Sequence, residues 1–512
     1  MASESRECEQ DIFPPNTPPP ELFIGLIGPL GSPTDKMRDF LKAEFEQCGY
    51  QPFVVRLSDE LARLLPTLSP FEDERTDQLI QAGNKVCSST GHGNAVARLA
   101  IHKVMRQRMD SEERSSKRVW ILQSLKRKEE VALLRFVYGD AFFALAVNAS
   151  YETRVKRYAT RLRLTRPTLN EERAKATAVK MIERDESETS ESGVQFGQNV
   201  RQTFPLADVI VPGDQMNNLE MAIHGFVRLL FGENRVPNFH EHAMYLADGS
   251  AALSASLSRR VGACLATEKG EIISVGANEV PKAGGGQYGG EDPDGRDKDL
   301  DADYSTLSLR FLAGTTLEVL KDAGWLKDSD DELDKRASDM FEILKQRDAV
   351  LVHVIEYMRA VHAEAAAILD AGRRGVPTRG ASLYTTTYPC HLCAKEIVAA
   401  GIKQVTYIET YPKSRAQSMY GEEIDGNIGC DDSSSRVPFL PFEGVAPRAY
   451  RRLFLGAGPR RKSDQGRVLE FTPDRPLNGH EIWASMQSMQ SLEDKAVAPI
   501  LNLNTLSGEG EA

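Results

Sequence analysis

One cysteine pair between two strand patterns places the tightest constraint on how this chain folds. The stretch "ASLYTTTY" (381–388) predicts a strand, "CHLCAKEIVAAG" (390–401) a helix and "IKQVTYIETY" (402–411) another strand. Two strands joined through a helix lie parallel in one sheet, so we expect an α/β fold here. The three-residue spacing puts Cys390 and Cys393 on the same face of the first helical turn.

Two kinds of chemistry fit a C-x-x-C pair at the start of a helix. The positive end of the helix dipole favours thiolate over thiol. Thiolates serve a metal site, and they equally serve a redox dithiol on a strand–helix–strand unit. The local pattern leaves both alternatives open, so the decision depends on residues elsewhere in the chain.

The deciding residues stand upstream, in "AVHAEAAAIL" (360–369). His362 precedes Cys390 by 28 positions (390 − 362 = 28). One histidine and two cysteines are ligands that zinc accepts in a tetrahedral site whose fourth position holds water. Glu364 can then stand beside that water as a proton carrier without binding the metal. The order H-x-E … P-C-x-x-C, completed by Pro389, is typical of zinc-dependent nucleobase deaminases, whereas a redox pair has no need of H-x-E.

The histidine inside the pair, His391, is not expected to be a ligand. It lies one residue beyond Cys390, so its side chain should point away from the face that carries the sulfurs. In the expected reaction Glu364 takes a proton from water, and the hydroxide attacks C4 of a cytosine-type ring. Glu364 then passes protons to N3 and to the departing amine.

Composition and charge are those of a soluble globular protein. The chain has 512 residues, of which 41% are hydrophobic and 27% charged. Its net charge of −11 disfavours a broad electrostatic grip on nucleic acid or an anionic membrane. There are seven scattered cysteines, an acidic and proline-rich start without a signal-peptide pattern, and no apolar run long enough for a bilayer. These features predict a cytoplasmic protein with reduced thiols and no membrane partner.

Strand and helix patterns divide the chain into two α/β parts. Four apolar stretches separated by helical ones predict a parallel sheet over roughly residues 20–235; they are 21–30, 51–58, 118–125 and 140–150. Further on, 259–281 predicts a hairpin, 283–301 a glycine-rich loop and 353–375 a long helix-rich segment. We therefore expect a flexible lead-in at 1–20, α/β domains at 21–235 and 236–460, and a partly disordered extension at 461–512, loose from about 487.

Several stretches also resemble a known family. "HAEAAAIL", "GASLYTTTYPCHLCAKEIVAAGI" and "YIETYPKSRA" resemble the deoxycytidylate deaminase branch of the cytidine-deaminase-like fold. Together with "FIGLIGPLGS", "GQNVRQTFPLADVIV" and "VPFLPFEGVAPRAY" they resemble bacterial anti-phage dCTP deaminases over roughly residues 20–455. The resemblance implies an N-terminal P-loop, nucleotide-kinase-like parallel sheet domain followed by a cytidine-deaminase-like α/β/α domain.

This resemblance implies conversion of dCTP, and of dCMP as well, to the deoxyuridine nucleotide, with depletion of dCTP during phage infection. It matches Asn278 to the asparagine that holds the sugar, although a turn residue after a strand is an equal alternative. The nucleotide's phosphates need cations. Five cations are candidates by sequence context: Arg259, Arg260, Lys282, Lys413 and Arg415.

The glycine turn after the first predicted strand departs from the phosphate-binding motif G-x-x-x-x-G-K-[ST]. Counted from Gly28, the positions for Gly, Lys and Ser/Thr hold Pro33, Thr34 and Asp35. The backbone amides can still cradle phosphate, so a bound nucleotide, a regulatory role and a plain strand–helix turn all remain open. The candidate phosphate-binding residues are Gly28, Gly31 and Ser32.

Three functions remain open from the sequence. The first is an enzyme acting on free deoxycytidine nucleotides, whether for defence or as a housekeeping deoxycytidylate deaminase. The second is a deaminase that edits nucleic acid, against which the acidic composition weighs. The third adds to the first: the N-terminal half senses a nucleotide, RNA or protein and gates the C-terminal half. We also expect a homo-oligomer and an inhibitory RNA or protein.

Overall fold

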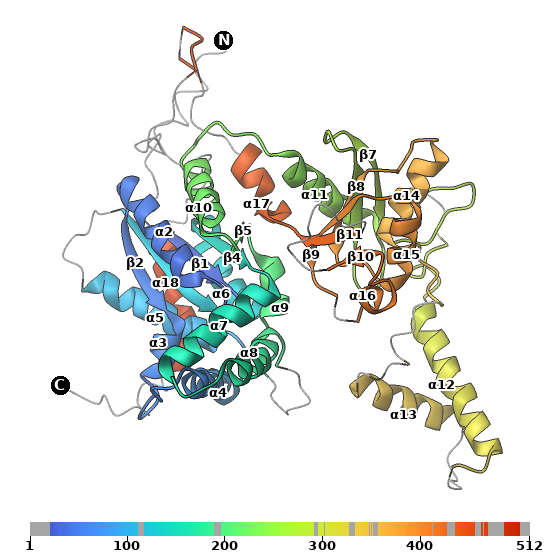
Figure 1. Ribbon diagram of the computed structural model, residues 1–512, viewed down its shortest axis with the longest axis horizontal. Helices are drawn as coiled ribbons and strands as arrows, with labels where there is room; N and C mark the ends of the chain where they lie inside the picture. Colours follow the sequence, from blue (N-terminus) through green and yellow to red (C-terminus); the bar gives the residue numbers. More distant parts are fainter. Residues whose placement is uncertain are drawn as a thin grey trace. The chain divides into compact units, whose positions relative to one another are not determined.

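The computed structural model (Figure 1) divides the chain into two compact units, Met1–Glu241 with Glu443–Ala512, and His242–Phe442. The second unit is therefore inserted into the chain of the first, whereas the sequence predicted consecutive domains. The structure describes residues 21–110, 117–188, 196–290, 295–301, 303–326, 333–347, 349, 351, 357–411, 413–426, 436–455, 462–463, 465–468 and 486–501. The predicted lead-in at 1–20 lies outside these residues.

The first unit is built on a six-stranded sheet in the order β12-β5-β4-β1-β3-β2. All neighbouring pairs are parallel except β12 with β5. The predicted parallel sheet and its four strands are confirmed, and β5 and β12 add the far edge. The strands are β1 (Glu21–Ile27), β2 (Gln51–Arg56), β3 (Arg118–Leu125), β4 (Phe142–Asn148), β5 (Val209–Pro212) and β12 (Gly444–Val445).

Helices cover both faces of this sheet. Every residue of β1 and β4 is buried, as expected for central strands of a parallel sheet with two covered faces. Helix α2 packs against α10, while α5 packs against α3, α6 and α18. The helices are α2 (Thr34–Gln47), α3 (Leu57–Ala62), α4 (Glu72–Thr90), α5 (Ala95–Met109), α6 (Lys128–Tyr138), α7 (Tyr151–Thr165), α8 (Glu171–Glu186), α9 (Val200–Thr203), α10 (Met216–Leu230), α17 (Pro447–Tyr450) and α18 (Met486–Val497).

The C-terminal helix α18 overturns one sequence expectation. Residues from about 487 were expected to be loose, yet α18 packs on α5 and α6. Its Glu493 is fully buried and forms a 2.6 Å ion pair with Arg108 of α5, which also binds Glu21 of β1 at 2.6 Å. Its polar sequence suggested a loose tail, but here Glu493 joins a buried ion-pair network with Arg108, 385 positions away, and Glu21, a further 87 positions from Arg108.

The second unit holds another six-stranded sheet, in the order β10-β11-β9-β8-β6-β7. The hairpin β6–β7 is antiparallel, β6 pairs antiparallel with β8, and the pairs from β8 to β10 are parallel. The predicted hairpin and the strand–helix–strand around the cysteines are confirmed. The strands are β6 (Gly262–Ala266), β7 (Ile272–Ala277), β8 (Ser382–Thr387), β9 (Gln404–Glu409), β10 (Ile424–Asp425) and β11 (Val437–Pro441).

The helices of the second unit include two that carry the candidate site, α14 and α15. Within the predicted helical segment 353–375, residues 353–356 lie outside the described residues. Of the remainder, the helix begins only at Ala363, because Val361 pairs with Glu279 in a β-bridge and His362 has an extended backbone. The helices are α12 (Tyr304–Asp322), α13 (Leu333–Gln346), α14 (Ala363–Arg373), α15 (His391–Ala399) and α16 (Ala416–Met419), with α11 (Phe239–Ser250) crossing between the units in sequence.

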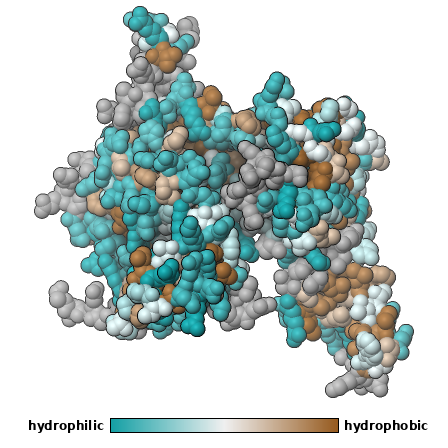
Figure 2. Space-filling model, in the orientation of Figure 1, coloured by the Kyte–Doolittle hydropathy of each residue, from teal (hydrophilic) through white to brown (hydrophobic). Residues whose placement is uncertain are grey.

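The apolar side chains of the helices concern two further features of the described residues. Helices α12 and α13 pack against each other. Apolar side chains on these helices and just after α12 are exposed; these are Leu307, Phe311, Val319, Ile343 and Trp325. Figure 2 shows hydrophobic surface, in brown, in the part of the view where Figure 1 labels the two helices. Among the described residues, no helix combines the length and the apolar character needed to cross a bilayer.

Candidate metal centre

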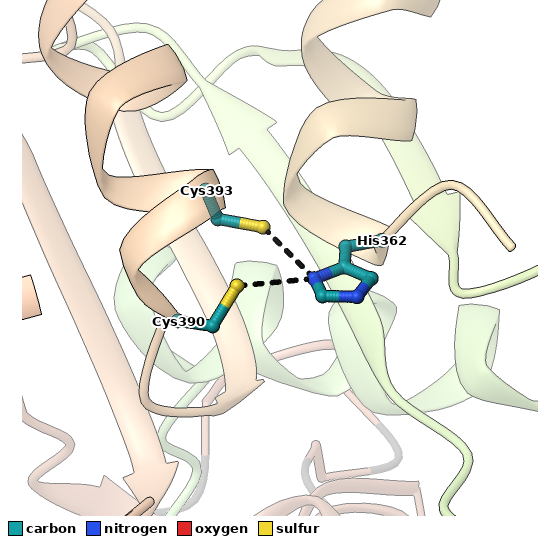
Figure 3. A group of neighbouring side chains, drawn as sticks. All are labelled: His362, Cys390 and Cys393. Carbon is teal, nitrogen blue, oxygen red and sulfur yellow. Dashed lines mark hydrogen bonds between the residues drawn. The ribbon is translucent and has the colours of Figure 1, made fainter. Parts of the chain in front are cut away.

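The site forms where two helices begin. His362 is the N-cap of α14 and Cys390 is the N-cap of α15, with Cys393 in the first turn of the same helix. Figure 3 shows the imidazole and both sulfurs pointing toward one another from the two helix starts. The positive ends of two helix dipoles thus meet here, and they favour ionised cysteine ligands.

Close packing of α14 on the sheet sets this geometry. A Cβ atom on Gly276 of β7 would collide with the carbonyl oxygen of Ala363, so glycine is required for the start of α14 to approach the strand. Ser274 of the same strand donates a 2.8 Å hydrogen bond to the carbonyl oxygen of Ala367. The sheet therefore holds the first turns of α14, and with them His362, in a fixed position.

The distances within the cluster fit a zinc ion. The Nδ1 atom of His362 lies 3.2 Å from the sulfur of Cys390 and 3.3 Å from that of Cys393, and all three ligand atoms lie within 4.8 Å of one another. A tetrahedral zinc with ordinary bond lengths needs about 3.6 Å between nitrogen and sulfur. An outward movement of a few tenths of an ångström by each ligand is enough to admit the ion.

Glu364 lies beside the cluster without belonging to it. Its carboxyl oxygen Oε2 accepts a hydrogen bond from the Cys393 sulfur at 3.5 Å. The group of described residues that could hold a metal contains His362, Cys390 and Cys393 and no carboxylate. Glu364 is only 5% exposed, so its carboxyl group faces the protein interior at the site. This is the placement expected of a proton carrier next to a metal.

The pKa values at the site reflect burial and mutual contact. Burial raises the pKa of Glu364 to about 7, against an opposing effect of His362. Hydrogen bonding from Cys393, and further from His362, lowers the pKa of the Cys390 thiol to about 4. The carboxyl group of Glu364 therefore has a proton affinity suited to accepting and returning protons near neutral pH, and Cys390 is a thiolate ready to bind a metal.

His391 takes no part in the ligand cluster of the described residues. Figure 3 shows the metal-binding side chains, all of which come from positions 362, 390 and 393. This agrees with the direction expected from its place in the helix, one residue beyond Cys390.

A loop after β9 supports the cysteine turn through Ser414, a residue for which no role was predicted from the sequence. The Ser414 hydroxyl donates a 2.7 Å hydrogen bond to the carbonyl oxygen of Pro389, directly before Cys390. Burial raises the pKa of the Tyr411 hydroxyl group. The nearby Cys390 thiolate raises this pKa further, and the positive charge of Arg259 lowers it. Both residues fall in "YIETYPKSRA", so a signal existed, although their individual roles depend on the fold.

Asn278 binds the main chain of a neighbouring loop. Its Oδ1 accepts a 2.7 Å hydrogen bond from the Val261 amide, and its Nδ2 donates a 2.8 Å hydrogen bond to the carbonyl oxygen of Arg259. The side chain is buried. In this structure Asn278 fixes the loop that carries Arg259, and its contact with the sugar stays a prediction.

The candidate cations fall into two groups. Arg259 pairs with Glu409 at the end of β9 at 3.4 Å, and its side chain is 53% exposed. Lys413 and Arg415 are exposed on either side of Ser414, which binds the cysteine turn. Arg259, Lys413 and Arg415 therefore lie on loops next to that turn. Arg260 is exposed one residue beyond Arg259.

Lys282 lies elsewhere. Its amide bonds to Gly286 in a tight loop, and the neighbouring Gly285 faces Arg373 at the last turn of α14. Nine residues separate Glu364 from Arg373, which is about 14 Å along a helix. The loop that carries Lys282 therefore contacts the last turn of α14 through Gly285, and a phosphate contact of Lys282 stays a prediction.

The N-terminal candidates share one turn of the first unit. Gly28 and Ser32 lie between β1 and α2, and Gly31 between them has a left-handed backbone with φ of +86°. Glycine is suited to this position for two reasons. It adopts the left-handed backbone without strain, and a Cβ atom here would collide with the carbonyl oxygen of Arg154. Lys36, the nearest lysine in sequence, is exposed on α2.

Comparison with known proteins supports the assignment of the second unit. Residues 237–409 match the family model described as the cytidine and deoxycytidylate deaminase zinc-binding region. The chain is 55% identical over 53 residues to ComE operon protein 2 of Bacillus subtilis (strain 168), which covers 10% of this chain and 28% of that protein. It is 49% identical over 86 residues to deoxycytidylate deaminase of Enterobacteria phage T2, which covers 17% of this chain and 43% of that protein.

The chain thus spans less than half the length of these curated relatives. Among solved structures, dCMP deaminase from the cyanophage S-TIM5 in apo form shares 15% identity at a TM-score of 0.22, covering 41% of this chain and 100% of that one. The zinc prediction is confirmed, because the matched region is a zinc-binding one and contains His362, Cys390 and Cys393. The second unit is a cytidine-deaminase-like domain.

Proposed function

We propose that the unit His242–Phe442 hydrolyses the amino group of a free deoxycytidine nucleotide, dCTP and also dCMP, giving the deoxyuridine nucleotide and ammonia. The observation that carries this proposal is the buried Glu364 carboxyl group, 3.5 Å from a sulfur of the metal cluster yet outside the ligand set. A purely structural zinc site has four protein ligands and needs no such neighbour.

The reaction requires proton transfers that Glu364 is placed to perform. When bound, zinc lowers the pKa of a water molecule in its fourth position and so supplies the nucleophile near neutral pH. The Glu364 carboxylate accepts a proton from the attacking water and delivers it to N3 of the ring as C4 becomes tetrahedral. The C4 hydroxyl group of the tetrahedral intermediate gives a second proton, through the same carboxyl group, to the amino nitrogen. The C4–N bond then breaks, the C4 carbonyl forms and ammonia leaves.

Substrate binding is assigned to the loops around the cysteine turn. Arg259, Lys413 and Arg415 offer three cations there, and phosphate oxygens form charge-assisted hydrogen bonds with such groups. Asn278 positions Arg259 through its main-chain carbonyl, and its amide group is proposed to contact the sugar as well. Three cations suit a triphosphate better than a monophosphate.

We further propose, from the resemblance to anti-phage dCTP deaminases, that the biological role is depletion of dCTP during phage infection. Such an activity harms the host unless it is restrained. The first unit is therefore proposed to bind a nucleotide, RNA or protein that controls the second, and the assembly is proposed to be a homo-oligomer.

A substrate panel tests the proposed activity. The full chain is incubated with dCTP, dCMP, CTP and single-stranded DNA, and ammonia and uracil products are measured with and without a zinc chelator. We expect turnover of dCTP and dCMP that the chelator abolishes. Activity on single-stranded DNA with none on free nucleotides would overturn the proposal in favour of a nucleic-acid editor.

A further inference from the structure

The turn between β1 and α2 already contains an anion from its own chain. The Leu30 amide, in the middle of the turn, donates a 2.7 Å hydrogen bond to Oδ2 of Asp185. Asp185 comes from the last turn of α8 and is 2% exposed. A carboxylate oxygen thus occupies the hydrogen-bonding direction of an amide that, at a strand-to-helix turn, is suited to a phosphate oxygen.

A lysine from another strand completes this arrangement. The ammonium group of Lys126, directly after β3, lies 2.9 Å from Oδ1 of Asp185 and donates a 2.8 Å hydrogen bond to the carbonyl oxygen of Gly28. The phosphate-binding motif lacks its lysine in the turn itself, and the fold supplies one from 98 positions away. The turn therefore contains both a cation and a resident anion.

The position within the sheet is one where ligands bind in α/β proteins. From β1 the chain moves to β2 on one side of the sheet, and from β4 it moves to β5 on the other, while β1 and β4 are neighbours. The crevice at the carboxyl ends of two such strands is the usual ligand site of an open parallel sheet. Asp185 reaches this crevice from the connection between β4 and β5.

Two buried polar atoms near the turn lack a hydrogen-bond partner among the described residues. One is the hydroxyl oxygen of Ser32 in the turn itself, and the other is Nη1 of Arg154. Arg154 is 7% exposed, its main chain abuts Gly31, and its Nη2 pairs at 2.7 Å with Glu186, the neighbour of Asp185. An unpaired guanidinium hydrogen at this depth costs free energy, so it points to a missing anionic partner.

We propose that this turn is a phosphate site that the chain closes with its own carboxylate, and that Asp185 and an external phosphate group compete for it. Phosphate offers more oxygens than the carboxylate and so can also bind Ser32 and Arg154. In the resting protein Asp185 holds the turn shut, and a phosphate group displaces the end of α8 when it binds.

Replacement of Asp185 tests the competition. Binding of inorganic phosphate to the full chain is measured by equilibrium dialysis for wild type and Asp185→Ala. We expect at least tenfold tighter phosphate binding by the variant, and loss of that gain when Lys126→Ala is added. Asp185→Asn, which keeps the shape and removes the charge, should show a smaller gain and guards against misfolding of the alanine variant.

Asp208→Ala is the matched control. Asp208 is also buried in the first unit, pairs with Arg135 at 2.7 Å and accepts the Ala144 amide at 2.8 Å, but it serves no glycine turn. The Asp208→Ala variant should bind phosphate as wild type does. The binding that both proteins show then measures any phosphate bound by the cations of the second unit. Equal phosphate binding by the Asp185 and Asp208 variants would overturn the proposal.

A parallel titration with ATP identifies the source of the phosphate group. Tighter binding of ATP than of inorganic phosphate by Asp185→Ala would assign the site to a nucleotide. Equal affinity would assign it to the phosphate group alone.

Discussion

Two turns of this protein share one local architecture and differ in what fills them. Residues 28–32 follow the buried strand β1 and lead into α2, and residues 389–393 follow β8 and lead into α15. In the second unit the turn supplies its own ligands, the two cysteine sulfurs, and meets a histidine from another helix start. In the first unit the turn supplies no metal-binding side chain, and its Leu30 amide donates a hydrogen bond to a buried aspartate of α8.

A strand-to-helix turn by itself provides an electrostatic field that favours a bound anion, but it does not determine which reaction or ligand the site has. The helix dipole stabilises an anion at both places. Side chains in the turn decide whether that anion is a metal-binding thiolate or a partner taken from elsewhere in the chain. We therefore expect changes at the cysteine turn to abolish a reaction, and changes around it to adjust binding or rate.

Loss of a metal ligand should have the largest effect. Cys390→Ala removes one of three protein ligands, so zinc content and ammonia release should both fall to background. Zinc per chain, measured by atomic absorption alongside activity, checks this. Cys264→Ala is the control, because Cys264 is equally buried in β6 but outside the cluster. Retained zinc in the Cys390 variant would contradict the assigned ligand set.

Loss of a phosphate-binding cation should be the next largest effect. A charged hydrogen bond contributes about 1.5–3 kcal/mol, so Arg415→Ala should raise KM for dCTP roughly 10- to 100-fold and leave kcat nearly unchanged. Lys403→Ala is the control. This exposed lysine directly precedes β9, at the end of the strand away from Arg415, and it pairs with Glu268. If both variants have the same KM, Arg415 does not bind the phosphates.

The pH dependence should report the carboxyl group of Glu364. Burial raises its pKa to about 7, and a protonated carboxyl group cannot accept the proton of the attacking water. Hence kcat/KM should fall as pH decreases, approaching a tenfold loss per pH unit. Bound zinc opposes protonation, so the midpoint should lie at or below about 7. A kcat/KM that rises with acidity would contradict the role of Glu364 as the base.

The smallest effect is expected at Ser414. Ser414→Ala removes the 2.7 Å hydrogen bond to the Pro389 carbonyl. A net loss of about 1 kcal/mol corresponds to roughly fivefold easier removal of zinc by a competing chelator. Ser414→Thr keeps the hydroxyl group and should restore wild-type retention. Chelator competition that does not distinguish Ser414→Ala from wild type would show that this loop does not support the metal site.

The sequence could predict the metal ligands because their information is local. His362 with Glu364, and Cys390 with Cys393, each form a short pattern on one element, and only one long-range pairing had to be guessed. The strands and helices that carry them follow from hydrophobic periodicity in the same way. The start of α14 was misplaced, because the β-bridge between Val361 and Glu279 is a tertiary contact.

Features that depend on distant partners could not be predicted. Asp185 reaches Leu30 across 155 positions, and Glu493 reaches Arg108 across 385. No spacing rule links such residues, since each pair is brought together only by the order of strands and the packing of helices. The candidate cations show the same limit, because Arg259 comes beside the end of β9 only through its ion pair with Glu409, 150 positions further along the chain.

The most direct test of the central claim compares metal content with turnover in Glu364→Ala. The claim is that His362, Cys390 and Cys393 hold zinc while the buried carboxyl group beside them moves protons. We predict that Glu364→Ala binds one zinc per chain, as wild type does, and that its kcat for dCTP deamination is lower by roughly 100- to 10,000-fold. Loss of zinc together with activity, or deamination close to the wild-type rate, would contradict the claim.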